Sequence, residues 1–96
     1  MPSATRQSDY CTGHDDCAPT PLVTFSPDVF INGRGAGRVG DLYAPHGCIV
    51  HPTHQDHISA GSGTVKINGI PAARIGDPVI LAGSVRDGSG NVTIGG

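Results

Sequence analysis

An internal repeat constrains the fold of this chain more than any other sequence feature. The segment 26–33, Ser-Pro-Asp-Val-Phe-Ile-Asn-Gly, returns without gaps as 62–69, Ser-Gly-Thr-Val-Lys-Ile-Asn-Gly. Both copies run on to an Arg-x-Gly-Asp, so the full copies cover 26–41 and 62–77, and a partial copy, Ser-Gly-Asn-Val-Thr-Ile-Gly-Gly, covers 89–96. A unit this short cannot bury an apolar face alone, so the copies must pack against one another.

Each copy is predicted to form a β-hairpin. Its Val-x-Ile pair places two branched side chains on one face of a strand. In the full copies an Asn-Gly dipeptide follows, which favours a type I′ turn because both of its positions tolerate a positive φ. We expect three hairpins gathered around a common axis, with pseudo-threefold symmetry and a base built from Val29, Ile31, Val65, Ile67, Val92 and Ile94.

The composition favours a single all-β domain over residues 1–96. The chain has no Glu and one Lys, whereas Gly supplies 15 residues and Pro 8, which favours strands and tight turns over helix. A domain of this size buries only a marginal core. With no Trp, two Phe and two Tyr, it is expected to need a staple, either a metal ion or a partner surface.

Charge and hydropathy exclude several function classes. The formal net charge is -2 and the six Lys and Arg residues are scattered, so no nucleic-acid partner is expected. No apolar run approaches the roughly 20 residues of a membrane-spanning helix, and residues 1–10 are too polar for a signal peptide. We expect a protein that is synthesised in the cytoplasm and does not use the general export route.

All five histidines lie outside the repeated hairpins, which is difficult to explain by packing: His14, His46, His51, His54 and His57. Imidazole and thiol groups together suit a structural zinc ion with four ligands. Exposed loop histidines with ordinary titration are the alternative. The three cysteines are an odd number, which argues against a complete disulfide framework, although a bond between Cys11 and Cys17 remains open.

Several ordered motifs resemble one known family. The second copy contains Pro71-Ala72-Ala73-Arg74, and related segments lie at 12–14, 45–48 and 92–96, so the likeness covers about residues 9 to 96. The chain resembles the PAAR-repeat proteins, the spike tips of type VI secretion systems and contractile phage tails. This resemblance implies a cone with a metal-pinned apex, whose blunt base caps a homotrimeric β-helical spike with one copy per trimer.

The resemblance also implies the site residues and the location. It assigns the metal ligands to His14, His46 and His54, with Cys48 as the fourth and His51, His57 and Cys17 as alternatives. The implied ion is structural zinc, with iron as the alternative. A spike tip of this kind contacts the target membrane transiently as it pierces it, on a virion tail or when secreted with a contractile machine. The sequence does not distinguish phage from bacterial machinery, nor does it show whether cargo is carried.

Two other functions are kept as alternatives, a small zinc metalloenzyme and a free-standing metal-binding adhesin module. The segment 51–57 has histidines at a spacing seen in catalytic zinc sites, yet Pro52 opposes a helix there and the chain has no Glu to act as general base. We therefore predict that the protein is not an enzyme. The recurring Arg-x-Gly-Asp is predicted to be a local turn contact, with a docking role as the alternative.

Overall fold

The computed structural model describes residues 1–14, 17–48, 51–80 and 83–96, without the side chains of Cys48 and His51. This part of the chain is built from short antiparallel hairpins and holds no helix, which confirms the all-β prediction. Accordingly, no described segment is a helix long and apolar enough to span a membrane. The hairpins are β1 (Phe30–Ile31) with β2 (Arg34–Gly35), β3 (His46–Cys48) with β4 (His51–His54), β5 (Lys66–Ile67) with β6 (Ile70–Pro71), and β7 (Pro78–Val79) with β8 (Gly83–Ser84).

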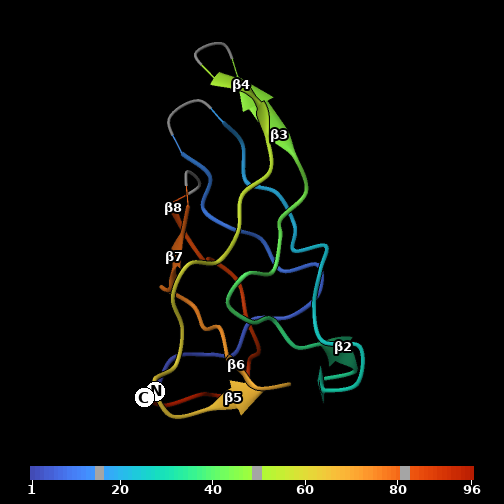
Figure 1. Cartoon of the computed structure of the whole chain (residues 1–96), viewed down its shortest axis with the longest axis vertical. Coiled ribbons are helices and arrows are strands. Elements are labelled where there is room, and N and C mark those ends of the chain that lie inside the picture. The colour runs from blue at the N-terminus through green and yellow to red at the C-terminus, as the bar shows by residue number, and fades with distance from the viewer. Residues whose placement is uncertain (15–16, 49–50, 81–82) are drawn as a thin grey trace.

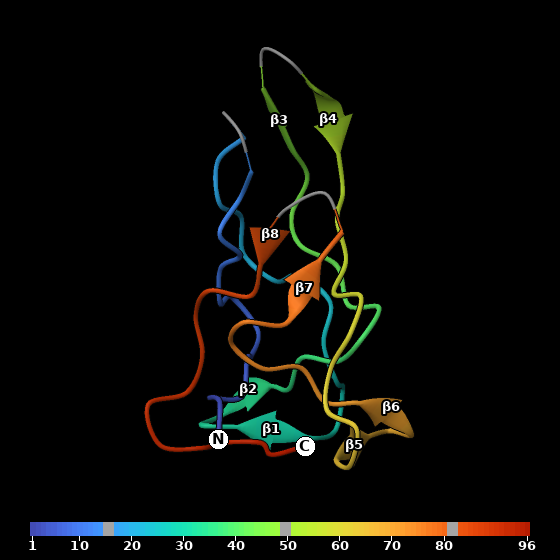
Figure 2. The ribbon, with the colours of Figure 1, turned by 90° about the vertical axis from the view of Figure 1, so that its left-hand side faces the viewer.

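The molecule is elongated, with extents of 37 × 24 × 22 Å. Hairpin β3–β4 lies at one end, which we call the tip, and hairpins β1–β2 and β5–β6 lie with both termini at the other end, which we call the base (Figures 1 and 2). The repeat therefore supplies the base, and the segments between copies extend toward the tip.

The two Asn-Gly dipeptides form the predicted turns. Asn32 and Gly33 have φ of 54° and 77°, and Asn68 and Gly69 have φ of 56° and 75°. Ile31 pairs with Arg34 and Ile67 with Ile70, so each loop contains only these two residues. Positive φ at both positions is the signature of a type I′ turn, which matches the twist of the paired strands.

The third copy is completed by the other end of the chain. Each copy is closed by a bond from an alanine amide to the carbonyl of the Val-x-Ile valine, and the N-terminal segment supplies the third alanine. Only a truncated copy, 89–96, is recognisable in the sequence, because the residues that complete it, 2–9, lie at the opposite end of the chain. These three closing bonds join Ala36 to Val29 at 2.9 Å, Ala72 to Val65 at 3.0 Å, and Ala4 to Val92 at 3.0 Å.

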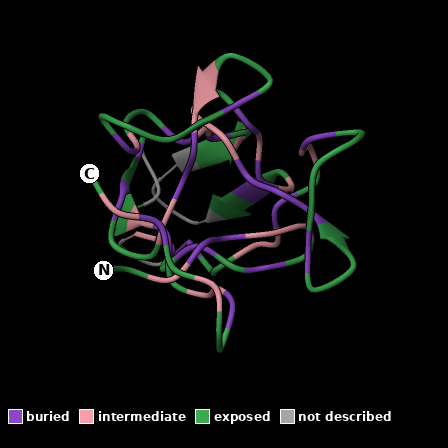
Figure 3. Cartoon of the chain, turned by 90° about the horizontal axis from the view of Figure 1, so that it is seen from below, coloured by how far each residue is buried: buried purple, intermediate pink, exposed green. Residues whose placement is uncertain are grey.

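A closed ring of backbone hydrogen bonds joins the copies around one axis. The amide of Thr5 donates to the carbonyl of Ala73 at 3.2 Å, Ala73 donates to Gly37 at 3.0 Å, and Gly37 donates back to Thr5 at 3.0 Å. Seen from below, the loops project outward around the centre and do not lie side by side in one layer (Figure 3). This arrangement has the predicted pseudo-threefold symmetry.

The core follows the same symmetry in two layers. Near the base, each copy contributes one isoleucine and one alanine: Ile31, Ile67 and Ile94 with Ala4, Ala36 and Ala72. The second layer lies closer to the tip and holds three further pairs, joined by isolated β-bridges: Cys11 with Val85, Tyr43 with Leu22, and Val79 with Ile58. Each layer is filled by matched positions from all three copies, so no copy has a core of its own.

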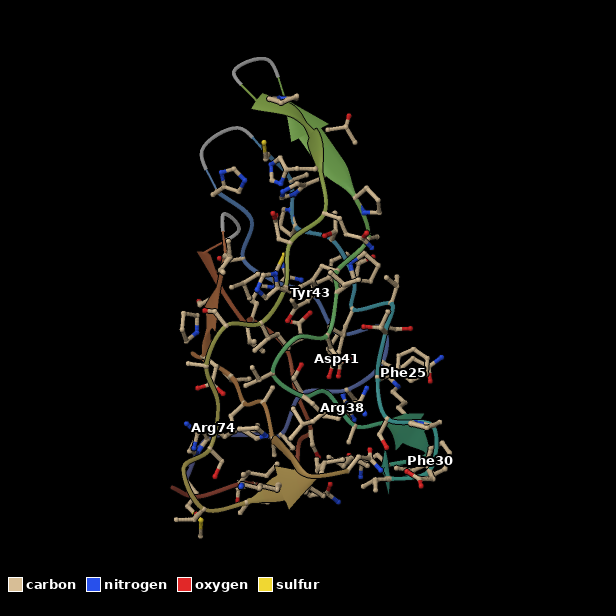
Figure 4. All side chains as sticks on the ribbon, viewed as in Figure 1. Phe25, Phe30, Arg38, Asp41, Tyr43 and Arg74 are labelled. Atoms are coloured by element: carbon tan, nitrogen blue, oxygen red, sulfur yellow. The ribbon has the colours of Figure 1, made fainter. Side chains whose placement is uncertain are left out.

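The contact between the Arg and Asp of the Arg-x-Gly-Asp motif is local, as predicted, and among the described residues the same Arg–Asp contact occurs in all three copies. In each case the aspartate accepts hydrogen bonds from the arginine backbone amide and guanidinium; two of the pairs are labelled in part in Figure 4. The third pair, which the sequence analysis missed, belongs to the N-terminal segment, where Ala-x-Arg-x-x-Asp at 4–9 is the signal that could have found it. The Nε to Oδ2 distances are 3.0 Å for Arg6 and Asp9, 3.0 Å for Arg38 and Asp41, and 3.1 Å for Arg74 and Asp77.

Candidate metal centre and base surface

Three loops leave the second core layer toward the tip, at 10–21, 42–57 and 78–84. They begin and end at matched pairs, since Tyr10 bridges Pro21, Leu42 bridges His57, and Pro78 pairs with Ser84. The first loop is tightened by reciprocal backbone bonds between His14 and Cys17, at 3.2 and 2.7 Å. The second carries strands β3 and β4. Histidines occur in the first two loops, so these two could hold an ion.

These loops bring four potential ligands together: His14, Cys17, His46 and His54, whose ligand atoms all lie within 4.8 Å of one another. His46 and His54 are register partners across β3–β4, with ring centroids 4.5 Å apart. The ring of His14 lies 5.1 Å from each of the other two rings. A tetrahedral zinc ion takes its nitrogens at about 2.0 to 2.1 Å, which places ligand atoms roughly 3.3 to 3.5 Å apart. The Nε2 atoms of His14 and His54 are 3.3 Å apart, which fits that spacing.

Hydrogen bonds orient two of the imidazoles. Nδ1–H of His54 donates to Oδ1 of Asp56 at 2.6 Å, and Nδ1–H of His46 donates to the carbonyl of Ala18 at 2.7 Å. Both acceptors fix the proton on Nδ1, so in each neutral ring Nε2 carries the lone pair. This is the tautomer in which a histidine binds a metal through Nε2.

Nε2 of His46 supports the fit of a metal. It is buried and forms no hydrogen bond to any described residue, and Oδ2 of Asp56 lies 2.8 Å away. A buried polar nitrogen left unpaired costs free energy. An ion bound by the imidazoles would satisfy it, so the residues present fit a metal.

The cysteines differ from the predictions in part. Cys11 is a free thiol buried in the core, which excludes the disulfide to Cys17 that the sequence left open. Cys17 is disulfide-bonded in this structure, so its sulfur has the position of a ligand but must be reduced to offer a thiolate. Cys48 and His51, one predicted ligand and one alternative, have side chains outside the described part of the structure. His57 is not in the cluster.

The base surface combines buried and exposed members of the predicted set. Ile31, Ile67 and Ile94 are 7 to 8% exposed and belong to the core, so they support the base from inside. Val29 and Val65 are 36 and 38% exposed, and Phe30 beside Val29 is 60% exposed. Val29, Val65 and Phe30 are therefore accessible apolar groups of the base, whereas the three isoleucines are not.

Three serines join each copy to the turn of the next copy. The Oγ of each serine accepts from the amide of its own Val-x-Ile valine and donates to an oxygen across the copy boundary. Serine opens all three copies in the sequence, and this constant position was the available signal for the contact. The cross-copy bonds run from Ser26 to Asn68 Oδ1 at 2.7 Å, from Ser62 to the Gly95 carbonyl at 2.6 Å, and from Ser89 to Asn32 Oδ1 at 2.6 Å.

Comparison with known proteins points to one family. Residues 12–86 match the PAAR motif family. The chain is 36% identical over 81 residues to the NAD(P)(+) glycohydrolase toxin Tse6 of Pseudomonas aeruginosa strain PAO1, covering 78% of this chain and 19% of the toxin. It is also 36% identical over 81 residues to the (p)ppApp synthetase toxin Tas1 of strain UCBPP-PA14, covering 78% of this chain and 18% of that protein. The chain thus spans about a fifth of the length of these relatives.

Proposed function

The chain belongs to the PAAR motif family, and on that basis we propose that it is a structural spike tip of a type VI secretion or phage tail machine, whose base caps a homotrimeric β-helical spike. The observation that carries the proposal is the ring of hydrogen bonds through Thr5, Gly37 and Ala73, which arranges three near-copies about one axis. A single chain with this symmetry can meet the end of a homotrimer with three similar contacts. One copy would then bind per trimer.

The base has the chemistry for such docking. Its short strands and turns carry exposed valines and Phe30, with hydrogen-bonded asparagines and serines around them. An apolar centre with a polar rim is the usual anatomy of a stable protein interface. Spike strands could also continue the short base hairpins, which would cover their open edges.

The tip would hold a structural metal ion. We propose His14, His46 and His54 as ligands, with a cysteine thiolate as the fourth, Cys48 by family position or Cys17 by its place in the cluster. When bound, zinc, with iron as the alternative, would cross-link the first two tip loops. Structural zinc contributes on the order of 10 kcal/mol to the folding of small domains, enough to keep a loop-built point rigid.

A mechanical role follows from this arrangement. Sheath contraction in the partner machine would supply the force, and the tip would concentrate it on a small area of membrane. The chain corresponds to about a fifth of two curated toxins, so we propose that the shared part is a carrier module and that toxin chemistry belongs to other parts of those proteins. We propose no enzymatic activity for this chain.

Charged substitutions at the base test the docking. We expect the double variant Val29→Asp and Val65→Asp to lose co-purification with a trimeric spike protein, because two carboxylates would be desolvated at the interface. The matched control is Ile80→Asp, which alters a similarly exposed residue, 44% exposed, that follows strand β7. Native mass spectrometry should give one chain per trimer for the wild type and the control.

The rival functions predict other outcomes. A free-standing adhesin module would remain monomeric beside the spike in every variant, and this result would refute the docking proposal. A metalloenzyme would show turnover that chelation abolishes and metal restores. Binding of the double variant to the spike at wild-type strength would place the docking surface elsewhere.

A further inference from the structure

Asp56 lies between two of the tip histidines. Its side chain is 3% exposed, with Oδ1 2.6 Å from Nδ1 of His54 and Oδ2 2.8 Å from Nε2 of His46. Its backbone carbonyl accepts from the amide of Tyr43 at 2.9 Å, which anchors it to the second core layer. The carboxylate is thus held in place by the core and directed at the histidine cluster.

The partners of Asp56 differ from those of the other buried aspartates. Asp9, Asp41 and Asp77 are each paired with an arginine, which offsets the cost of burying a carboxylate. Among the described residues, the ion-pair partners of Asp56 are imidazoles alone. A buried carboxylate without an arginine partner is costly to desolvate, and a cation held by those imidazoles would offset that cost.

We propose that Asp56 is the positioning residue of the metal centre, an outer carboxylate that holds His54 in its ligating tautomer and balances the charge of the ion from beside His46. The proposal rests on the metal centre proposed above. Outer carboxylates of this kind fix the ring orientation of a ligating histidine and raise its basicity. Asp56 would not touch the ion itself.

The pseudo-symmetry shows that the carboxylate is not required by the fold. In the first tip loop the matching position is Thr20, whose carbonyl accepts from the amide of Cys11 at 3.1 Å, as the carbonyl of Asp56 does from Tyr43. The backbone contact is therefore made equally well by a residue without a carboxylate. The acid occurs in the loop that supplies two of the three histidines.

The test compares metal affinity with stability in the full chain under reducing conditions. Zinc affinity is measured by competition with a chromophoric chelator, and the cobalt(II) absorption spectrum reports ligand geometry. We expect Asp56→Asn to weaken zinc binding by about 10- to 100-fold and to change the cobalt spectrum. Asp56→Thr, which introduces the residue found at the matched position, should weaken zinc binding to a similar extent. It replaces Asp56→Asn in the test if that variant fails to fold.

The control variant is Asp77→Asn, which weakens the pair with Arg74 outside the metal centre. It should lower the Tm of the metal-free and zinc-loaded protein alike and leave zinc affinity within about threefold of the wild type. Zinc affinity and a cobalt spectrum unchanged in Asp56→Asn or Asp56→Thr would overturn the role of Asp56. A wild-type chain that takes up neither metal would overturn the metal centre as well. The docking proposal would still be tested separately, by co-purification with the spike.

Discussion

Individual residues break the threefold pattern where the matched positions differ in chemistry. Tyr43 occupies a core position that Cys11 and Val79 fill in the other copies, and its side chain is almost fully buried (Figure 4). Its hydroxyl makes no hydrogen bond to any described residue. Burial raises the pKa of Tyr43 above its ordinary range, because the phenolate would be desolvated.

Tyr43→Phe tests the cost of this hydroxyl. We expect the free energy of unfolding at pH 7 to stay the same or rise by about 1 kcal/mol, because an unpaired buried polar group is removed. Since the folded-state pKa is raised, the wild type should lose stability as the pH rises above about 10, and the variant should lose less. Urea unfolding at pH 7 and pH 11 measures both effects. A destabilisation above about 1 kcal/mol would instead show a bonded hydroxyl.

At the scale of elements, the Arg–Asp turn is the unit that recurs in every copy. Asp9 in the N-terminal segment accepts from the guanidinium and amide of Arg6, as Asp77 does from Arg74, and both carboxylates are almost fully buried. In each turn the second residue after the arginine adopts a positive φ. These residues are Gly40, Gly76 and, in the N-terminal copy, Ser8. The N-terminal segment is therefore as structural as the full copies.

Asp9→Ala and Asp77→Ala should destabilise the protein by similar amounts. We expect about 2 to 4 kcal/mol each, because a partly buried arginine and its amide lose a charged acceptor. Denaturant unfolding measures both. Asp87→Asn is the control, since Asp87 pairs with Arg86 at the surface and should cost under about 1 kcal/mol. If Asp9→Ala cost as little as the control, the N-terminal segment would not be an integral copy.

The whole molecule is a three-part ring whose chain ends meet inside one part. The amide of Ile94 donates to the carbonyl of Pro2 at 2.9 Å, and both termini lie at the base (Figures 1 and 2). Gly96 has a φ of 81°, close to the 77° and 75° of Gly33 and Gly69. The chain ends thus occupy the place of a hairpin turn, with Gly96 before the break and Pro2 after it.

A circular permutant tests this closure. Gly96 is joined directly to Pro2, without Met1, and the chain is opened between Gly69 and Ile70. We expect the permutant to unfold within about 2 kcal/mol of the wild type, because the break moves from one matched turn to another. Circular dichroism during denaturant unfolding measures this stability.

The control permutant is opened between Val39 and Gly40, whose amides donate to the carbonyls of Pro71 and Ile58. It should be much less stable, because the new ends disrupt bonds that join two copies. Equal stability of the two permutants would contradict the closure.

Local sequence was enough to predict the hairpins β1–β2 and β5–β6, their Asn-Gly turns and the symmetry, whereas the choice of His14, His46 and His54 came from the family resemblance. The hairpins, turns and symmetry depend on short-range backbone preferences and on a repeat that is recognisable in the sequence. The third copy was seen only in part, because its halves are at opposite ends of the sequence and only folding joins them. The burial of the isoleucines, the free thiol of Cys11 and the placing of Asp56 also depended on the folded chain, since each follows from which copies pack together rather than from neighbours along the backbone.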